Sequence, residues 1–75
     1  MSNWHKLNQG MWVHDARQEY VSLRAQDSSQ KMFKAMKGIY QYSAFGIAYP
    51  ISKRWQTLAN AKADALNYMK KHPNG

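Results

Sequence analysis

The chain has 75 residues, which is the size of a single small domain. It contains no cysteine, so disulfide bridges and thiolate nucleophiles or ligands are excluded. No stretch approaches the roughly 20 apolar residues of a membrane span. The first residues lack the apolar run of a secretory signal, so we expect a cytoplasmic location. Eleven Lys and Arg residues against four Asp and Glu residues give a formal net charge of +7, an excess that attracts polyanions.

The first two predicted strands cover residues 4–7 and 11–14. Asn8-Gln9-Gly10 separates them as a turn, because Asn and Gly tolerate positive φ. Residues 11–14 alternate, with Met11 and Val13 on one face and Trp12 and His14 on the other. This period of two predicts a strand rather than a helix.

Residues 19–25 give the clearest strand pattern. Every second residue from Val21 to Ala25 is apolar, which predicts a core-facing side of Val21, Leu23 and Ala25. The opposite side is predicted to face solvent and carries Tyr20, Ser22 and Arg24.

The pattern of residues 31–52 does not by itself decide between strand, helix and loop. Residues 31–37 fit a strand, but the helical spacing of Met32, Phe33 and Met36 leaves a helix open. We favour the strand because it completes a meander. Residues 39–52 carry no charge and contain Gly46 and Pro50, which indicates a long loop or an irregular edge strand.

Residues 57–72 predict one C-terminal helix. Thr57 suits the N-cap, and Leu58, Ala61, Ala65, Tyr68 and Met69 form an apolar stripe at helical spacing. The predicted fold is therefore α+β, a three- to four-stranded antiparallel sheet packed on one C-terminal helix. The sheet is expected over roughly residues 3–37, a loop or edge strand over 39–56 and the helix over 57–72.

The order of these signals resembles small phage-encoded accessory proteins of the β-meander-plus-helix type. The residues that carry the resemblance are Trp4, Gly10 and Trp12, followed by Trp55, Thr57, Leu58, Ala61 and Lys62. The layout is similar also to the arm-type DNA-binding domains of phage integrases and to the plant AP2-like domain, in which a sheet resting on a helix reads DNA. This chain lacks their Gly-rich, Arg-dense strands, so the resemblance does not imply base-specific recognition. Small phage inhibitors of host enzymes share the same outline.

The sequence does not predict an enzyme. The four acids, Asp15, Glu19, Asp27 and Asp64, are scattered, and no nucleophile elbow or Gly-rich phosphate loop is present. His5, His14 and Asp15 could approach each other across the first hairpin, but a zinc site normally needs four ligands. We therefore expect no catalytic residue, no metal and no cofactor.

Basic residues with interleaved aromatic residues form the first candidate site. Lys and Arg contacts to phosphates supply sequence-independent affinity for nucleic acid. The candidates are Arg17, Arg24, Lys31, Lys34, Lys37, Lys53 and Arg54. On a strand, the three lysines at 31, 34 and 37 would not all share a face. Lys outnumbers Arg, the preferred reader of guanine, so the expected partner is nucleic acid, DNA before RNA, bound mostly through its backbone.

A protein interface is the alternative candidate. The uncharged segment is rich in Tyr, which is enriched at protein interfaces, so it either closes the core or docks on an acidic surface of a host protein. Its candidate anchors are Tyr40, Tyr42, Phe45 and Tyr49. A homodimer formed through an exposed sheet edge stays open as well.

Overall fold

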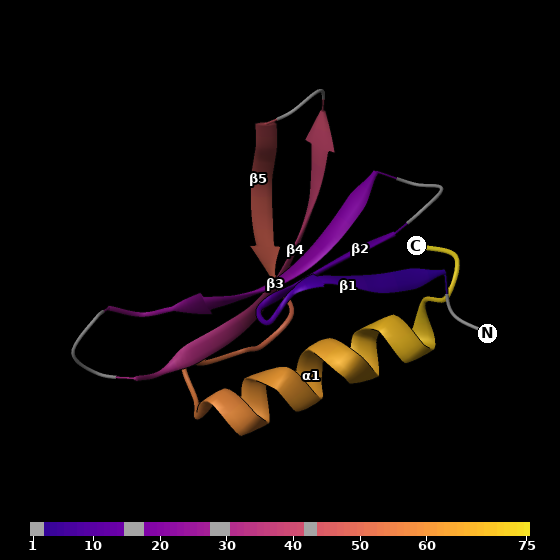
Figure 1. Cartoon of the computed structure of the whole chain (residues 1–75). Helices are drawn as coiled ribbons and strands as arrows, with labels where there is room; N and C mark the ends of the chain where they lie inside the picture. Colours follow the sequence, from indigo (N-terminus) through magenta and orange to yellow (C-terminus); the bar gives the residue numbers. More distant parts are fainter. Residues whose placement is uncertain (1–2, 15–17, 28–30, 42–43) are drawn as a thin grey trace.

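The computed structural model describes residues 3–14, 18–27, 31–41 and 44–75. In these residues the chain forms five strands followed by one helix (Figure 1). The strands are β1 (Trp4–Asn8), β2 (Met11–His14), β3 (Glu19–Ala25), β4 (Phe33–Gln41) and β5 (Ala44–Pro50), and the helix is α1 (Leu58–Lys71). Each strand pairs antiparallel with the next in one sheet of order β1-β2-β3-β4-β5. The predicted α+β class is confirmed, with five strands where three to four were expected.

The first hairpin follows the predicted pattern. A turn at Gln9 and Gly10 joins β1 to β2, and the Gly10 backbone N–H donates to the Asn8 side-chain carbonyl at 2.9 Å. In the register, Lys6 lies opposite Trp12 and Trp4 lies opposite His14. The Trp12 and His14 side chains therefore share a face with Trp4.

The open choice at residues 31–37 is settled in favour of the strand. β4 begins at Phe33 and pairs with the whole of β3, from Ala25 opposite Phe33 to Glu19 opposite Ile39. Continuous pairing with a neighbouring strand satisfies the backbone groups that a helix would have satisfied internally. The helical spacing of the apolar residues was therefore coincidental.

In its described residues the uncharged segment forms strand and not a long loop, so the irregular edge strand is the alternative that the structure confirms. Residues 39–41 continue β4, and β5 pairs with β4 as the edge strand of the sheet. The pairing is irregular between Gly38 and Tyr40. Pro50, which has no backbone N–H to donate, is the last residue of β5, where a sheet tolerates it.

α1 begins and ends within one residue of the predicted bounds. Thr57 is the N-cap, and its hydroxyl accepts a hydrogen bond from the Asn60 backbone N–H at 3.3 Å. Lys70 and Lys71 lie in the last turn, where cations complement the helix dipole. In the described part of the chain, no helix has both the length and the apolarity that a membrane crossing requires.

Loss of this N-cap gives a first testable prediction. Replacing Thr57 with Ala leaves one helix N–H without its partner, so we expect the free energy of unfolding to fall by about 1 kcal/mol. Urea unfolding followed by circular dichroism measures the change. Thr57→Ser keeps the hydroxyl and should stay near the native value, and equal losses in both variants would contradict the capping role.

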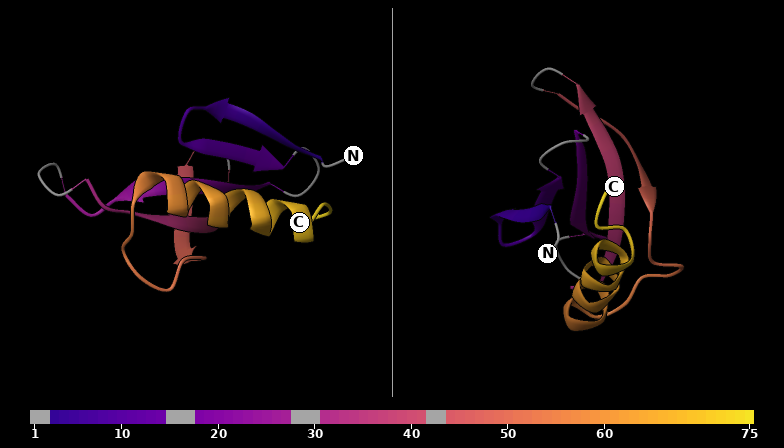
Figure 2. Two further views of the ribbon diagram at one scale, coloured as in Figure 1. Left: turned by 90° about the horizontal axis from the view of Figure 1, so that it is seen from below. Right: turned by 90° about the vertical axis from the view of Figure 1, so that its right-hand side faces the viewer.

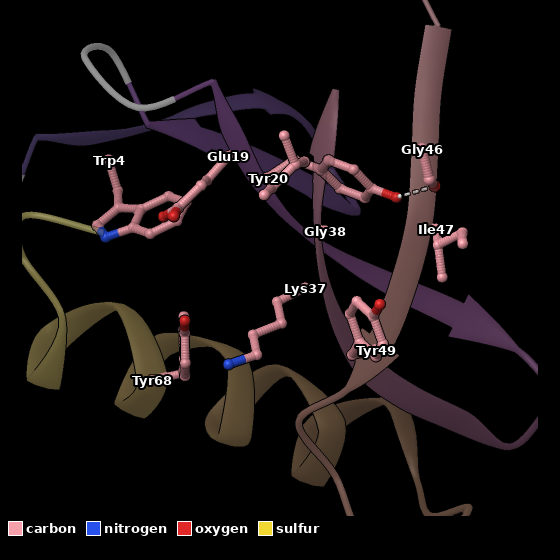
Figure 3. A pocket seen from close by; sticks show the side chains of 10 residues that line it. Trp4, Glu19, Tyr20, Lys37, Gly38, Gly46, Ile47, Tyr49 and Tyr68 are labelled. Atoms are coloured by element: carbon pink, nitrogen blue, oxygen red, sulfur yellow. Dashed lines mark hydrogen bonds between the residues drawn. The ribbon is translucent and has the colours of Figure 1, made fainter. Parts of the chain in front are cut away.

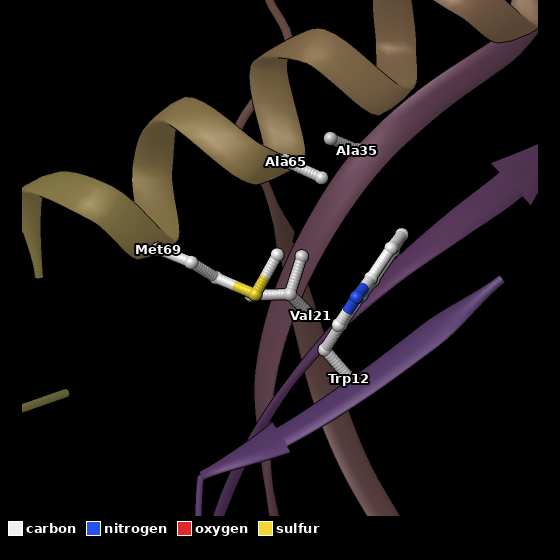
Figure 4. Close-up of a cluster of buried hydrophobic side chains, with 5 residues drawn as sticks. All are labelled: Trp12, Val21, Ala35, Ala65 and Met69. Carbon is white, nitrogen blue, oxygen red and sulfur yellow. The ribbon is translucent and has the colours of Figure 1, made fainter. Parts of the chain in front are cut away.

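The core lies between α1 and one face of the sheet. Trp12, Val21 and Ala35 from the sheet meet Ala65 and Met69 from the helix in a buried cluster (Figure 4). The register explains the sheet side of this cluster, because Trp12 lies opposite Val21 on adjacent strands. In Figure 2, α1 runs beneath the central strands, and β5 lies at the sheet edge.

The face of the sheet that is turned away from α1, here called the far face, is partly buried. Tyr20, predicted to face solvent, is only 4% exposed, and Val13 and Met36 on the same face are buried too. Conversely, Ala25 on the core-facing side is exposed, as is Leu58 at the start of the helix. The prediction for Tyr20 and Ala25 was wrong because a strongly twisted sheet (Figure 1) does not present two flat faces.

Candidate nucleic-acid interface

An aromatic pocket opens where α1 leaves the sheet uncovered. Lys37 on β4 lies opposite Tyr49 on β5, and Glu19 on β3 lies opposite Ile39, all on the helix-facing side. α1 packs on β3 and β4 but does not extend over β5. These side chains, with Trp4, Tyr20, Gly38, Gly46, Ile47 and Tyr68, line a cavity of about 610 Å³ (Figure 3). Its volume is in the range of small-molecule sites, about 300–1,000 Å³.

Tyr68 forms the helix side of the pocket and is held by contacts between rings. Its ring stacks on His72, with 4.2 Å between the centroids, and meets Trp4 edge-on at 6.4 Å. The Trp4 indole N–H donates to the His72 carbonyl at 2.7 Å. These contacts join the end of the helix to β1, so the Trp4 and Tyr68 walls are fixed relative to each other.

Tyr20 and Lys37 form the sheet side. The Tyr20 hydroxyl donates to the Gly46 carbonyl at 3.2 Å, which ties β3 to the edge strand (Figure 3). The Lys37 ammonium points toward Tyr68 and lies 5.0 Å from the centroid of its ring. This cation–π contact places a positive charge at the mouth of an aromatic cavity.

Glu19 is the acidic group of the pocket. Its Oε2 atom is buried and has no hydrogen-bond partner in the described part of the chain. A buried carboxylate oxygen without a donor is costly, so native structures seldom keep one without a reason.

A second cavity of about 500 Å³ meets the pocket at Tyr68, which lines both. We call it the basic groove. The segment before α1 forms one side of it, with Ile51, Lys53, Arg54 and Gln56, and α1 with His72 forms the other, with Asp64, Asn67, Tyr68 and Lys71. The groove therefore brings two basic residues of the segment to face two from the end of the helix, Lys71 and His72.

Buried Ser52 fixes the segment that carries Lys53 and Arg54. Its hydroxyl accepts from the Ala35 N–H at 3.0 Å and donates to the Asp64 carboxylate at 2.9 Å. The Gln56 side-chain amide also donates to that carboxylate. Asp64 is thus engaged in structural hydrogen bonds.

None of the lysines and arginines that the structure describes forms an ion pair with a described carboxylate. The positive charges of Lys37, Lys53, Arg54 and Lys71 are therefore available to an anionic partner in two cavities that share Tyr68.

The predicted basic residues divide between two regions. Lys37, Lys53 and Arg54 line the pocket and the groove. Arg24 and Lys34 lie opposite each other on the far face, where the Lys34 ammonium lies 4.8 Å from the Trp55 ring centroid. Lys31 is exposed just before β4, and Arg17 lies outside the described residues.

Of the predicted protein-interface residues, Tyr49 lines the pocket and is 58% exposed. Tyr40 and Phe45 are opposite each other in the β4–β5 pairing, and their side chains lie outside the described part, as does all of Tyr42. Ile39 and Ile47, also in the uncharged segment, are 54% and 76% exposed beside Tyr49.

Sequence reasoning missed Trp4, Glu19, Tyr68 and Lys71 as site residues. One signal was present, because Glu19 has the same parity as Val21 and Leu23 and so stands as an acid on the apolar side of its strand. Tyr68 gave no such signal, since it fits the apolar stripe of the helix.

The histidines do not converge. His14 lies opposite Trp4 and His5 lies opposite Val13, so the two imidazoles belong to opposite faces. A His14 ring nitrogen lies 2.9 Å from the Pro73 carbonyl oxygen, a contact that joins β2 to the C-terminus. Among the described residues no three His, Asp or Glu side chains gather as metal ligands, and Asp15 lies outside them.

Comparison with protein-family models, with curated proteins and with solved structures gives no significant match.

Proposed function

We propose that this chain is a small, basic, non-enzymatic protein that binds nucleic acid, DNA before RNA, mainly through phosphates. The observation that carries the proposal is a set of cations around Tyr68 that form no ion pair with any described carboxylate, namely Lys37, Lys53, Arg54 and Lys71. The net charge of +7 adds a long-range attraction for polyanions. A cytoplasmic accessory role, of the kind small phage proteins have, belongs to the same proposal.

The groove suits a flexible backbone better than a rigid duplex. Its cations line the same cavity as Tyr68, which also lines the aromatic pocket. Proteins that bind single strands combine a positive groove with aromatic rings on which bases stack. Lys31, Lys34 and Arg24 lie away from the groove and add to the positive electrostatic potential of the whole protein.

Salt dependence tests the proposal. We expect a labelled random single strand, followed by fluorescence anisotropy, to bind at about 50 mM salt and to weaken by orders of magnitude at about 200 mM, because binding releases counterions. A labelled duplex, measured in parallel, shows which form is preferred. Absence of binding to both at the lower salt would refute the proposed function.

Matched charge variants then test the groove. The groove variant replaces Lys53, Arg54 and Lys71 with Gln, and the control replaces Lys6, Lys62 and Lys70, which are exposed and line neither cavity. Both remove three positive charges. We expect only the groove variant to lower the slope of log K against log salt by about two units, at roughly 0.7 per lost phosphate contact. Equal losses would mean that net charge, and not the groove, provides the affinity.

One observation favours a second candidate, a protein–protein module. Ile39, Ile47 and Tyr49 are large apolar side chains, each more than half exposed, at the mouth of the pocket. Contiguous exposed apolar surface marks interaction sites. Under this alternative the lysines steer the protein to an acidic host surface, and a stoichiometric protein partner would be retained in a pull-down after nuclease treatment. Loss of all bound material on nuclease treatment would count against it.

A further inference from the structure

The aromatic pocket contains functional groups that phosphate binding does not require. A phosphate-binding surface needs cations, yet this cavity also holds four aromatic walls and the buried acceptor of Glu19. The occupant that completes it must stack on rings, donate a hydrogen bond to a carboxylate and carry a negative charge near Lys37.

A cation alone does not fit this description. The Lys37 ammonium already lies over the Tyr68 ring, and a second cation there would be repelled by it. An anion alone leaves Glu19 unsatisfied and brings a negative charge toward a carboxylate. A nucleotide carries its donor on the base and its negative charge on the phosphate, and the pocket offers Glu19 and Lys37 as separate partners on neighbouring strands.

We infer that the pocket receives one unpaired base of a single-stranded nucleic acid and that the Glu19 carboxylate selects bases bearing an exocyclic amino group. This inference rests on the proposed function. The amino groups of cytosine and adenine donate hydrogen bonds, and Asp or Glu accepts from the cytosine amine. Thymine and uracil present a carbonyl oxygen at the position where cytosine has its amine, and that oxygen faces the carboxylate without a proton. Lys37 then lies at the exit toward the groove, where the adjoining phosphate passes.

Oligomers of deoxycytidine and deoxythymidine of equal length test the selection. Both are pyrimidine strands with the same backbone charge, so a difference between them reports the base edge. At about 50 mM salt we expect the native protein to bind the cytidine strand roughly tenfold more tightly, the size of one specific base-edge contact.

Glu19→Gln identifies the residue responsible. The amide presents a donor as well as an acceptor, so the variant should bind both strands within about threefold of each other, a ratio set by stacking and phosphates alone. Asp27→Asn is the matched control, since it removes one carboxylate at an exposed position outside the pocket. It should keep the tenfold ratio. Circular dichroism confirms that each variant is folded.

The outcomes separate the two proposals. Binding of both strands with equal affinity by the native protein would overturn base selection and leave the proposed function standing. A ratio that Glu19→Gln and Asp27→Asn change equally would also overturn it, because net charge would then be the cause. If neither strand binds at low salt, the proposed function fails and this inference fails with it.

Discussion

Gly38→Ala should destabilise the protein by about 1–3 kcal/mol, the range for overpacking a filled interior. A Cβ at Gly38 would lie 2.6 Å from the Tyr20 hydroxyl oxygen and less than 3 Å from two carbons of its ring. Tyr20 is only 4% exposed, and its hydroxyl donates to Gly46, so the ring has little room to move. Elsewhere in a strand, replacing Gly with Ala usually stabilises by roughly 0.5–1 kcal/mol. The sign of the change therefore reports the ring contact.

Two further variants make this test specific. Gly10→Ala is the matched control, because nothing lies within 4 Å of its added Cβ, and we expect its stability to stay near the native value. In a Tyr20→Leu background, most of the penalty of Gly38→Ala should disappear, with a coupling of about 1 kcal/mol or more in a double-mutant cycle. Urea unfolding measures all four states. An unchanged stability of Gly38→Ala would show that the ring does not occupy this position.

Ala65→Leu should be at least as damaging. Ala65 and Ala35 are fully buried and belong to the cluster where α1 meets the sheet. Three added carbons would push the helix away or force strained side chains, at a cost of about 1–3 kcal/mol. For a domain of this size we expect the melting temperature to fall by roughly 5–20 °C, at about 4–8 °C per kcal/mol.

The control for this prediction lies two residues earlier on the same helix. Ala63 is exposed, so Ala63→Leu adds the same atoms with little contact and a small change in helix propensity. Its melting temperature should stay within about 3 °C of the native protein, as for most surface substitutions. Similar losses in the two variants would mean that α1 does not pack on the sheet through Ala65.

The helix could be predicted from local patterns, because its capping residue and its apolar spacing indicate the same segment. Thr57 gives its start and the apolar spacing gives its buried side, and both depend on neighbours within a few residues. The same holds for β2 and β3, whose bounds equal those predicted. For β5 the sequence left a loop and an edge strand both open, because a segment without charges has no alternation to show which face is solvated. Its strand conformation comes from pairing with β4.

The basic residues show that the two-residue period of a strand predicts which face a side chain lies on but not which distant residue it contacts. A spacing of three places Lys34 and Lys37 on opposite faces of β4, which the sequence does predict once the strand is accepted. It does not predict that Lys37 meets Tyr68, 31 residues further along the chain. Nor does it predict that Ser52 and Asp64 anchor the segment carrying Lys53 and Arg54 beside the helix.

The sequence by itself determined the α+β class, the order of strands before one helix, and the excess of positive charge. These follow from local periodicity, capping and composition, none of which depends on contacts between distant parts of the chain. Only the tertiary structure decided which cations share a surface, that Glu19 lies beside aromatic rings, and that the far face is partly buried. Those features depend on strand register, on sheet twist and on how far the helix covers the sheet, and long-range contacts determine all three.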